Sequence, residues 1–99
     1  MLQNKKVIVR HENSYTVYKY VNTDVIKVHN KYIQLNSGGW YTKSTKNLIN
    51  EVIDLHRLNW SLYQRKGIWL CTHKDMNFTA EFKDGIRLYN NGRVTFNNK

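Results

Sequence analysis

The chain has 99 residues, no proline and a single cysteine, Cys71. Lysine and arginine number 16 against 7 acidic residues, which gives a formal net charge of +9 at pH 7. One cysteine excludes a disulfide framework, and this length leaves no room for a second sizeable core, so we expect one domain over residues 1–99. The positive charge favours polyanionic partners: DNA, RNA or an acidic protein surface.

No apolar run approaches the roughly 20 residues that a membrane-spanning helix needs. Residues 1–20 also lack the apolar stretch and the small-residue cleavage site of a secretory signal. A lone thiol fits a reducing compartment, and we expect Cys71 to be buried in a strand. The sequence therefore predicts a cytoplasmic protein that makes no membrane contact.

The first part of the chain is rich in β-branched and aromatic residues, which favour strands. Four strands are predicted, over residues 5–11, 14–21, 23–29 and 32–35. Short turns at Glu12-Asn13 and Asn30-Lys31 make the strands that they join antiparallel.

Residues 44–58 change to a helical period. Leu48, Val52 and Leu55 recur at i, i+4 and i+7, and this spacing predicts an apolar stripe that faces the sheet. Thr42 or Ser44 is the expected N-cap, because a hydroxyl oxygen accepts a hydrogen bond from a main-chain N–H of the first turn. His56 borders the stripe, and we expect it to be packed and hydrogen-bonded.

After the helix the period returns to two. Five further strands are predicted, over residues 60–64, 68–73, 77–82, 86–90 and 93–97. A hairpin loop is expected at Arg65-Lys66-Gly67, and Asn91-Gly92 predicts a type I′ turn. The fold class that follows is α+β: an antiparallel β-meander of about seven to nine strands packed on a single central helix, about residues 44–58.

No constellation for catalysis or metal binding is visible. The four histidines do not pair at i+3 or i+4, and no carboxylate joins them at ligand spacing. Cys71 has no neighbouring histidine signature, and Gly38-Gly39 lacks the spacing of a phosphate loop. We therefore expect a protein that is not an enzyme and that uses no metal or cofactor.

The most distinctive segment, residues 35–50, places Trp40 and Tyr41 beside a glycine pair and before a helix. Lys43 and Lys46 fall in the first helical turn, where cations oppose the macrodipole, and an anionic partner would relieve that conflict. Trp40 has two interpretations: an exposed platform on which bases stack, or a plug that closes the core. Our candidate binding residues are Trp40, Tyr41, Lys43, Lys46, Lys27 and Lys31.

Two segments carry a resemblance: SGGWYTKSTKNLIN at residues 37–50 and YQRKGIWL at 63–70. The chain resembles a family of small bacteriophage-encoded domains with the pattern SGGW(Y/F)T..TK..IN. The resemblance implies a phage origin, and hence the host-cell cytoplasm as the place of action. It implies no activity, and no functional residue follows from it.

Two functions remain open. The first is an accessory protein that binds nucleic acid, DNA or RNA, with little sequence specificity, through Lys/Arg contacts to phosphates and stacking on aromatic residues. The second is a host-takeover or anti-defence inhibitor that binds an acidic surface of a host protein. An exposed edge strand would also support a homodimer by strand pairing.

Overall fold

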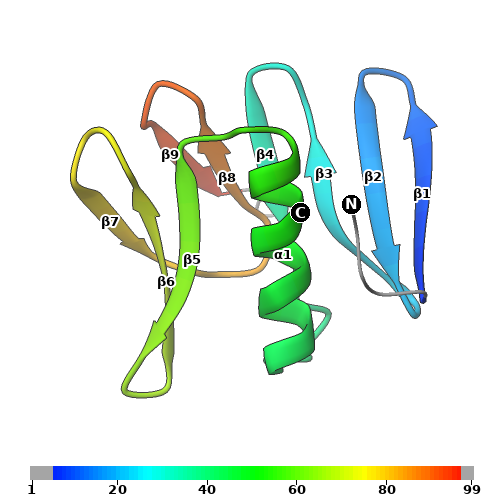
Figure 1. Cartoon of the computed structure of the whole chain (residues 1–99), viewed down its shortest axis with the longest axis horizontal. Helices are drawn as coiled ribbons and strands as arrows, with labels where there is room; N and C mark the ends of the chain where they lie inside the picture. Colours follow the sequence, from blue (N-terminus) through cyan, green and yellow to red (C-terminus); the bar gives the residue numbers. More distant parts are fainter. Residues whose placement is uncertain (1–5, 97–99) are drawn as a thin grey trace.

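The computed structural model describes residues 6–96, which form one large sheet and a second layer made of a helix and a smaller sheet (Figure 1). The large sheet has six antiparallel strands. In spatial order they are β1 (Val7–Glu12), β2 (Tyr15–Tyr20), β3 (Thr23–Val28), β4 (Tyr32–Leu35), β8 (Ile86–Tyr89) and β9 (Val94–Phe96). The strand prediction for residues 5 and 97 lies outside the described residues.

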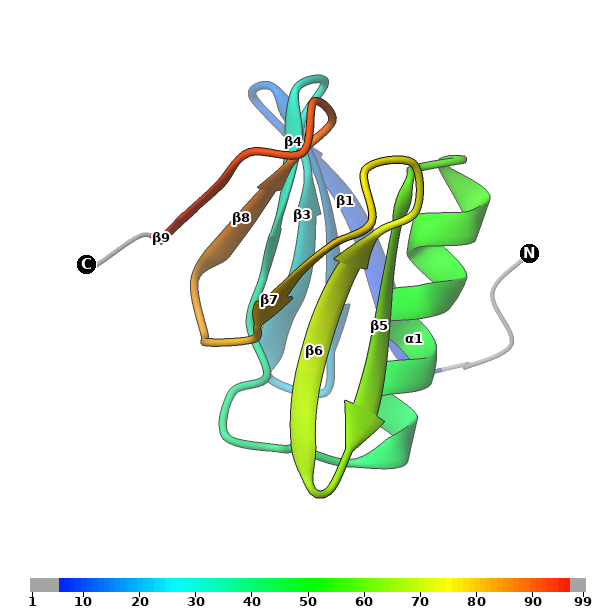
Figure 2. The ribbon, with the colours of Figure 1, turned by 90° about the vertical axis from the view of Figure 1, so that its left-hand side faces the viewer.

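The elements between β4 and β8 make the second layer. They are α1 (Lys43–Leu55), β5 (Trp60–Arg65), β6 (Ile68–His73) and β7 (Phe78–Glu81), and the three strands form a separate antiparallel sheet. Figure 2 shows α1 and β5 on one side of the large sheet. The predicted α+β domain, with antiparallel strands and a single helix, is confirmed for the described residues, although the strands divide between two sheets.

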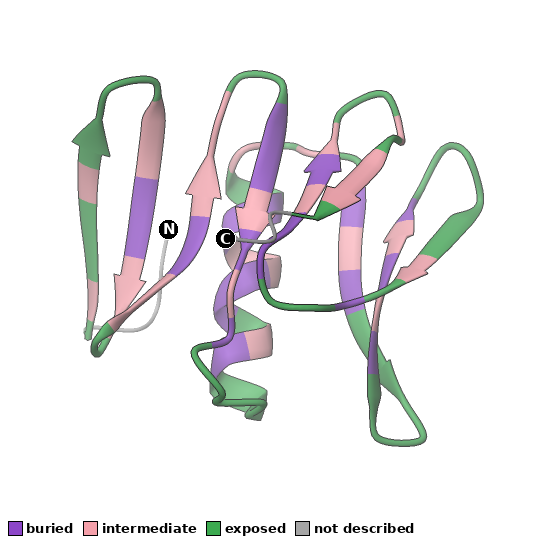
Figure 3. Ribbon diagram, turned by 180° about the vertical axis from the view of Figure 1, so that it is seen from behind, coloured by how far each residue is buried: buried purple, intermediate pink, exposed green. Residues whose placement is uncertain are grey.

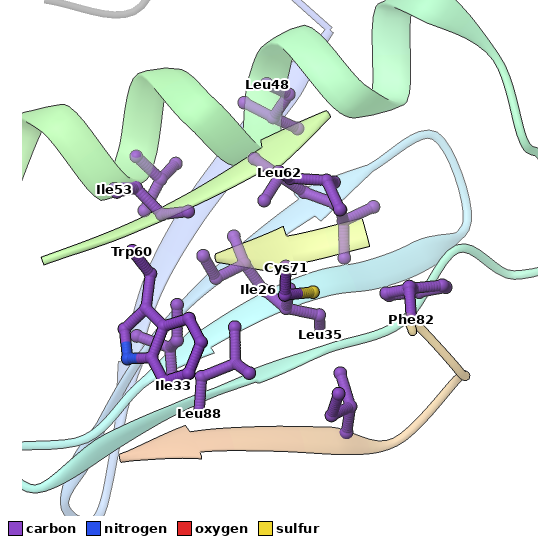
Figure 4. Packing of buried hydrophobic residues seen from close by; sticks show 14 of the residues in the cluster. Ile26, Ile33, Leu35, Leu48, Ile53, Trp60, Leu62, Cys71, Phe82 and Leu88 are labelled. Atoms are coloured by element: carbon purple, nitrogen blue, oxygen red, sulfur yellow. The ribbon is translucent and has the colours of Figure 1, made fainter. Parts of the chain in front are cut away.

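The core lies between the two layers (Figure 4). Its largest fully buried side chain is Trp60, whose indole N–H donates to the Tyr89 carbonyl at 2.9 Å and so links β5 to β8. Cys71 is fully buried, as predicted, and burial raises the pKa of its thiol to about 12. A thiol held in its neutral form is unreactive, so Cys71 acts as an apolar core residue.

Thr42 is the N-cap of α1, because its hydroxyl accepts from the Thr45 N–H at 3.2 Å. The helix ends at Leu55, three residues earlier than predicted. Arg57 adopts a left-handed conformation with φ of 55°, and the Leu58 N–H bonds back to the Ile53 carbonyl at 3.0 Å. This left-handed residue stops the helix and directs the chain into β5.

The predicted apolar stripe is wrong at Leu55, which is 48% exposed. The buried stripe consists of Thr45, Leu48, Ile49, Val52 and Ile53. At 3.6 residues per turn, Leu55 lies about 90° around the helix from the centre of that stripe. His56 lies closer to the centre: Tyr18 Oη and His56 Nε2 are 2.8 Å apart, and burial lowers the pKa of His56.

The predicted type I′ turn at Asn91-Gly92 is also wrong. A type I′ turn needs positive φ at both central residues, and of this pair only Gly92 has one, at 94°. The turn at Lys66-Gly67 meets that requirement, with φ of 53° and 80°, and it joins β5 to β6. Gly92 instead closes a longer loop, in which its N–H donates to the Tyr89 carbonyl at 2.9 Å.

The edge strands β5 and β1 differ in how far other groups of the chain satisfy their main-chain hydrogen bonds. The side-chain amide of Asn50 donates to the Leu62 carbonyl at 2.7 Å and accepts from the Leu62 N–H at 2.9 Å, so the helix satisfies part of the β5 edge. The edge strand β1 exposes Ile8 and Val9, and homodimerisation through it stays a prediction.

In the described part of the chain, no helix is long and apolar enough to cross a membrane.

Candidate functional site

The face of the large sheet that points away from α1 is covered by no other described element (Figure 3). We call it the outer face. The strand register brings Lys27 opposite Gln34, and Gln34 opposite Arg87, so these side chains project from this face together. Polar and aromatic side chains therefore alternate with the inward core residues along β4 and β8, whereas on β2 the position opposite Lys27 is the buried Val17.

Four rings from three parts of the chain form an aromatic cluster on the outer face: Tyr15, His29, Tyr32 and Tyr89, of which His29 and Tyr32 flank one turn. The His29 and Tyr32 rings are stacked, with centroids 4.6 Å apart and an interplanar angle of 18°. Tyr15 and Tyr89 flank this pair, 5.3 Å from His29 and 4.9 Å from Tyr32 respectively. Tyr32 is the most buried member, and burial is the main cause that raises its pKa to about 12.

Two arginines pack on the aromatic cluster. The Arg87 guanidinium lies 4.9 Å from the centroid of Tyr32, and that of Arg93 lies 5.5 Å from the centroid of Tyr89. Arg87 also donates to the Gln34 side-chain oxygen at 3.2 Å. The rings and Gln34 thus hold the cations in place, with donors left over for a ligand.

The outer face is strongly basic. The strands of this face, the β3–β4 turn and the β8–β9 turn contribute six basic residues: Arg10, Lys19, Lys27, Lys31, Arg87 and Arg93. Its two carboxylates, Glu12 and Asp24, are both bound by Arg10, at 2.7 and 2.9 Å. Because Arg10 donates to Asp24, the pKa of that carboxyl is lowered. Within residues 6–96 no other ion pair involves this face, so it keeps an excess of positive charge.

Two hollows lie at opposite ends of β4 on this face. One, of about 470 Å³, is lined by Asn30, Lys31, Tyr89, Asn90, Asn91 and Arg93. The other, of about 300 Å³, is lined by Asn22, Thr23, Asp24, Lys27, Gln34 and Asn36. Lys31 lines the first of these hollows and Lys27 the second.

Trp40 is 66% exposed, which overturns the core plug, and its role as a platform for bases stays a prediction. The loop that presents it is tied down: the Trp40 N–H donates to the Ser37 carbonyl at 3.0 Å, and the Ser37 N–H donates to Asp84 at 2.7 Å. Tyr41 is also exposed, and its ring packs edge-on against Trp69, which helps to close this end of the core.

The glycine pair in this loop makes a stability prediction. Gly38 and Gly39 have φ of 64° and 84°, where an alanine costs about 1–2 kcal/mol. A Cβ at Gly38 would also lie 2.3 Å from Thr23 Oγ1, whereas one at Gly39 would meet nothing within 4 Å. We expect Gly38→Ala to lower the melting temperature more than Gly39→Ala. Equal shifts would mean that the Thr23 side chain rotates away.

A third hollow, the Trp40 pocket, lies between this loop, the β2–β3 turn and α1. It has a volume of about 230 Å³ and is lined by Tyr20, Val21, Thr23, Val25, Ser37, Trp40 and Thr45. Thr23 also lines the hollow of about 300 Å³ on the outer face, so the two hollows meet at this residue.

The structure divides the predicted binding residues into two groups. Trp40, Tyr41, Lys43 and Lys46 lie together, in the loop before α1 and in its first turn. Lys46 donates to the Gln64 side chain at 3.2 Å, so part of its hydrogen-bonding capacity is already used. Lys27 and Lys31 lie on the outer face, and Lys27 lines a hollow that shares Thr23 with the Trp40 pocket.

Sequence reasoning missed the aromatic cluster and its arginines. Tyr15, Tyr32 and Tyr89 read individually as ordinary strand residues, and they are far apart in the sequence. The available signal was the phase of the alternation: because Ile33 and Leu35 point inward, Tyr32 and Gln34 point outward. Within residues 6–96 no group of three or more His, Cys, Asp or Glu side chains is placed to hold a metal ion.

The fold and this surface define a small antiparallel α+β domain with one basic, aromatic sheet face. The family model described as "Kyanoviridae Gp96 protein" matches residues 2–89, and the chain belongs to this family of bacteriophage proteins. This match supports the predicted phage-encoded small domain, and the pattern SGGW(Y/F)T..TK..IN stays a prediction. Neither the curated proteins nor the solved structures contain a match to the chain.

Proposed function

We propose that this phage protein binds single-stranded nucleic acid across its outer face, with little sequence specificity. The observation that supports this best is the aromatic cluster, with Arg87 and Arg93 packed on its rings and with Lys27 and Lys31 lining the two hollows of the outer face. Aromatic side chains stack on bases, and lysine and arginine contact phosphates, so the two halves of a nucleotide each find a chemically matched group.

A single strand suits this surface better than a duplex. Tyr15, His29 and Tyr89 are half-buried in the sheet surface, so part of each ring is exposed. In a single strand the faces of the bases are free to stack on such rings. A duplex hides its base faces in its own stack and would offer this surface only its phosphates. Stacking discriminates weakly between bases, which accounts for low sequence specificity.

The test compares two double variants that each remove two positive charges. Arg87→Gln/Arg93→Gln alters the outer face, and Arg65→Gln/Lys66→Gln alters the exposed β5–β6 hairpin in the other layer. Binding of a labelled single-stranded oligonucleotide is followed by fluorescence anisotropy at several salt concentrations. We expect the outer-face variant to lose about tenfold or more in affinity and the hairpin variant to lose little.

The salt dependence gives a second measure. Each phosphate contact to a single strand contributes about 0.7 to the log–log slope, so loss of two contacts should reduce that slope by about 1.4. Equal weakening by both double variants would indicate attraction to the whole basic surface and contradict this site. A protein that purifies without nucleic acid, ignores oligonucleotides and captures one host protein in the presence of nuclease would favour the alternative, a host-takeover or anti-defence inhibitor.

A further inference from the structure

Trp40 is a rigidly presented, exposed tryptophan. Besides the main-chain bonds of its loop, the Gly39 N–H donates to the Ser37 hydroxyl at 3.0 Å, and Ser37 itself is 1% exposed. Exposed tryptophans on fixed loops are enriched among the residues that dominate binding energies. The indole of Trp40, 66% exposed, is therefore placed to make contact with a ligand.

Val21, which lines the Trp40 pocket, has a strained main-chain conformation. Val21 has φ of 59°, which a β-branched residue rarely adopts, and its side chain is 57% exposed. Such strain costs about 1–3 kcal/mol and tends to persist at functional positions. Here it sets an apolar side chain in the lining of the Trp40 pocket.

The Trp40 pocket suits a flat heterocycle. Its volume of about 230 Å³ exceeds that of one nucleobase, and its wall is mainly apolar, because Ser37 and Thr45 are each only 1% exposed. Aromatic and aliphatic walls of this kind stack on the faces of a base.

The charge around the pocket suits a phosphate attached to that base. The first turn of α1 contains Lys43 and Lys46 and no acidic residue. Main-chain N–H groups of a first helical turn project from the helix end and favour an anion. A nucleotide bound at the pocket thus places its phosphate near the cations that otherwise oppose the helix dipole.

We infer that the Trp40 pocket receives one base at the end of the strand bound on the outer face, which rests on the proposed function. Thr23 lines both the pocket and the hollow that Lys27 also lines, so the two hollows adjoin at this residue. The aromatic cluster on the outer face then holds several bases by stacking, and the Trp40 pocket fixes where the strand ends.

The experiment measures the affinity of oligothymidylates of about 2 to 12 nucleotides, a range that covers typical site sizes of single-strand binding folds. We expect Trp40→Ala to weaken the longer oligonucleotides by about 5- to 150-fold, the equivalent of the 1–3 kcal/mol of one stacked base. The shortest oligonucleotides, which bind on the outer face alone, should bind wild type and variant equally. Phe78→Ala, an exposed aromatic residue on β7, is the control and should change neither.

Intrinsic fluorescence gives an independent measurement, because Trp60 and Trp69 are 0% and 4% exposed. Oligonucleotide should quench the emission of Trp40 in the wild type, and Trp40→Phe should abolish that quenching while it retains most of the affinity.

Three outcomes would overturn the pocket. In the first, Trp40→Ala binds every length as the wild type does while Arg87→Gln/Arg93→Gln loses affinity, which leaves the outer face standing alone. In the second, Trp40→Ala weakens all lengths equally, which indicates a general effect. In the third, the variant changes only self-association, which makes the pocket an interface between copies. A wild type that binds no oligonucleotide at all rejects the proposed function itself.

Discussion

Replacing Trp60 by alanine is expected to lower the free energy of unfolding by about 3–5 kcal/mol, measured by urea denaturation. Trp60 is fully buried between the layers, and its ring packs edge-on against His73 at 5.0 Å. The substitution removes the largest buried side chain, leaves a cavity, and deprives the Tyr89 carbonyl of the indole N–H that lies 2.9 Å away. It therefore weakens the contact that joins the second layer to β8.

Trp60→Phe separates the two contributions. It retains most of the apolar volume and removes the indole N–H. The Tyr89 carbonyl still accepts from the Gly92 N–H, so we expect a loss of about 0.5–1.5 kcal/mol, the value of one hydrogen bond. Trp40→Ala is the matched control, because the same residue type is exposed there and its loss should change stability by about 0.5 kcal/mol or less. If Trp60→Ala and Trp40→Ala were equally stable, the two layers would not depend on Trp60.

The helix and the strands of this fold can be predicted from the local sequence, whereas the pairing between strands is harder to predict. Alternation and turn residues place each strand within about two residues, because both signals lie within a few neighbouring positions. The division into two sheets depends on β4 pairing with β8, where Ile33 lies opposite Leu88. Nothing in the pattern around Ile33 distinguishes Leu88 from the apolar residues of β5 or β6. The strand that pairs with β4 is therefore determined by tertiary packing.

The same distinction explains the candidate site. Trp40 and Lys43 were found because glycine, aromatic and basic residues adjoin in one short segment. The pair Tyr32 and Tyr89 was missed because it arises only when β4 meets β8. Strand pairing decides which outward side chains become neighbours, and a surface assembled from several strands is visible only once that pairing is known.

The helix shows where periodicity alone is ambiguous. Leu48, Ile49, Val52, Ile53 and Leu55 are all apolar, so two overlapping stripes fit the same residues. The choice between them depends on what α1 packs against. Because β5 lies beside the helix and β3 beneath it, the stripe that contains Ile49 and Ile53 is buried, and Leu55 is left at its margin.

This placement gives the second large expected effect: Ile53→Ala should cost about 2–5 kcal/mol of unfolding free energy, and Leu55→Ala less than about 1 kcal/mol. Ile53 is 1% exposed and loses both transfer energy and packing, whereas Leu55 is 48% exposed and leaves no enclosed cavity. Both changes yield alanine on the same helix, so the difference reports burial. Urea denaturation of the two variants measures it, and equal losses, or a larger loss at Leu55, would mean that α1 is rotated from the orientation described.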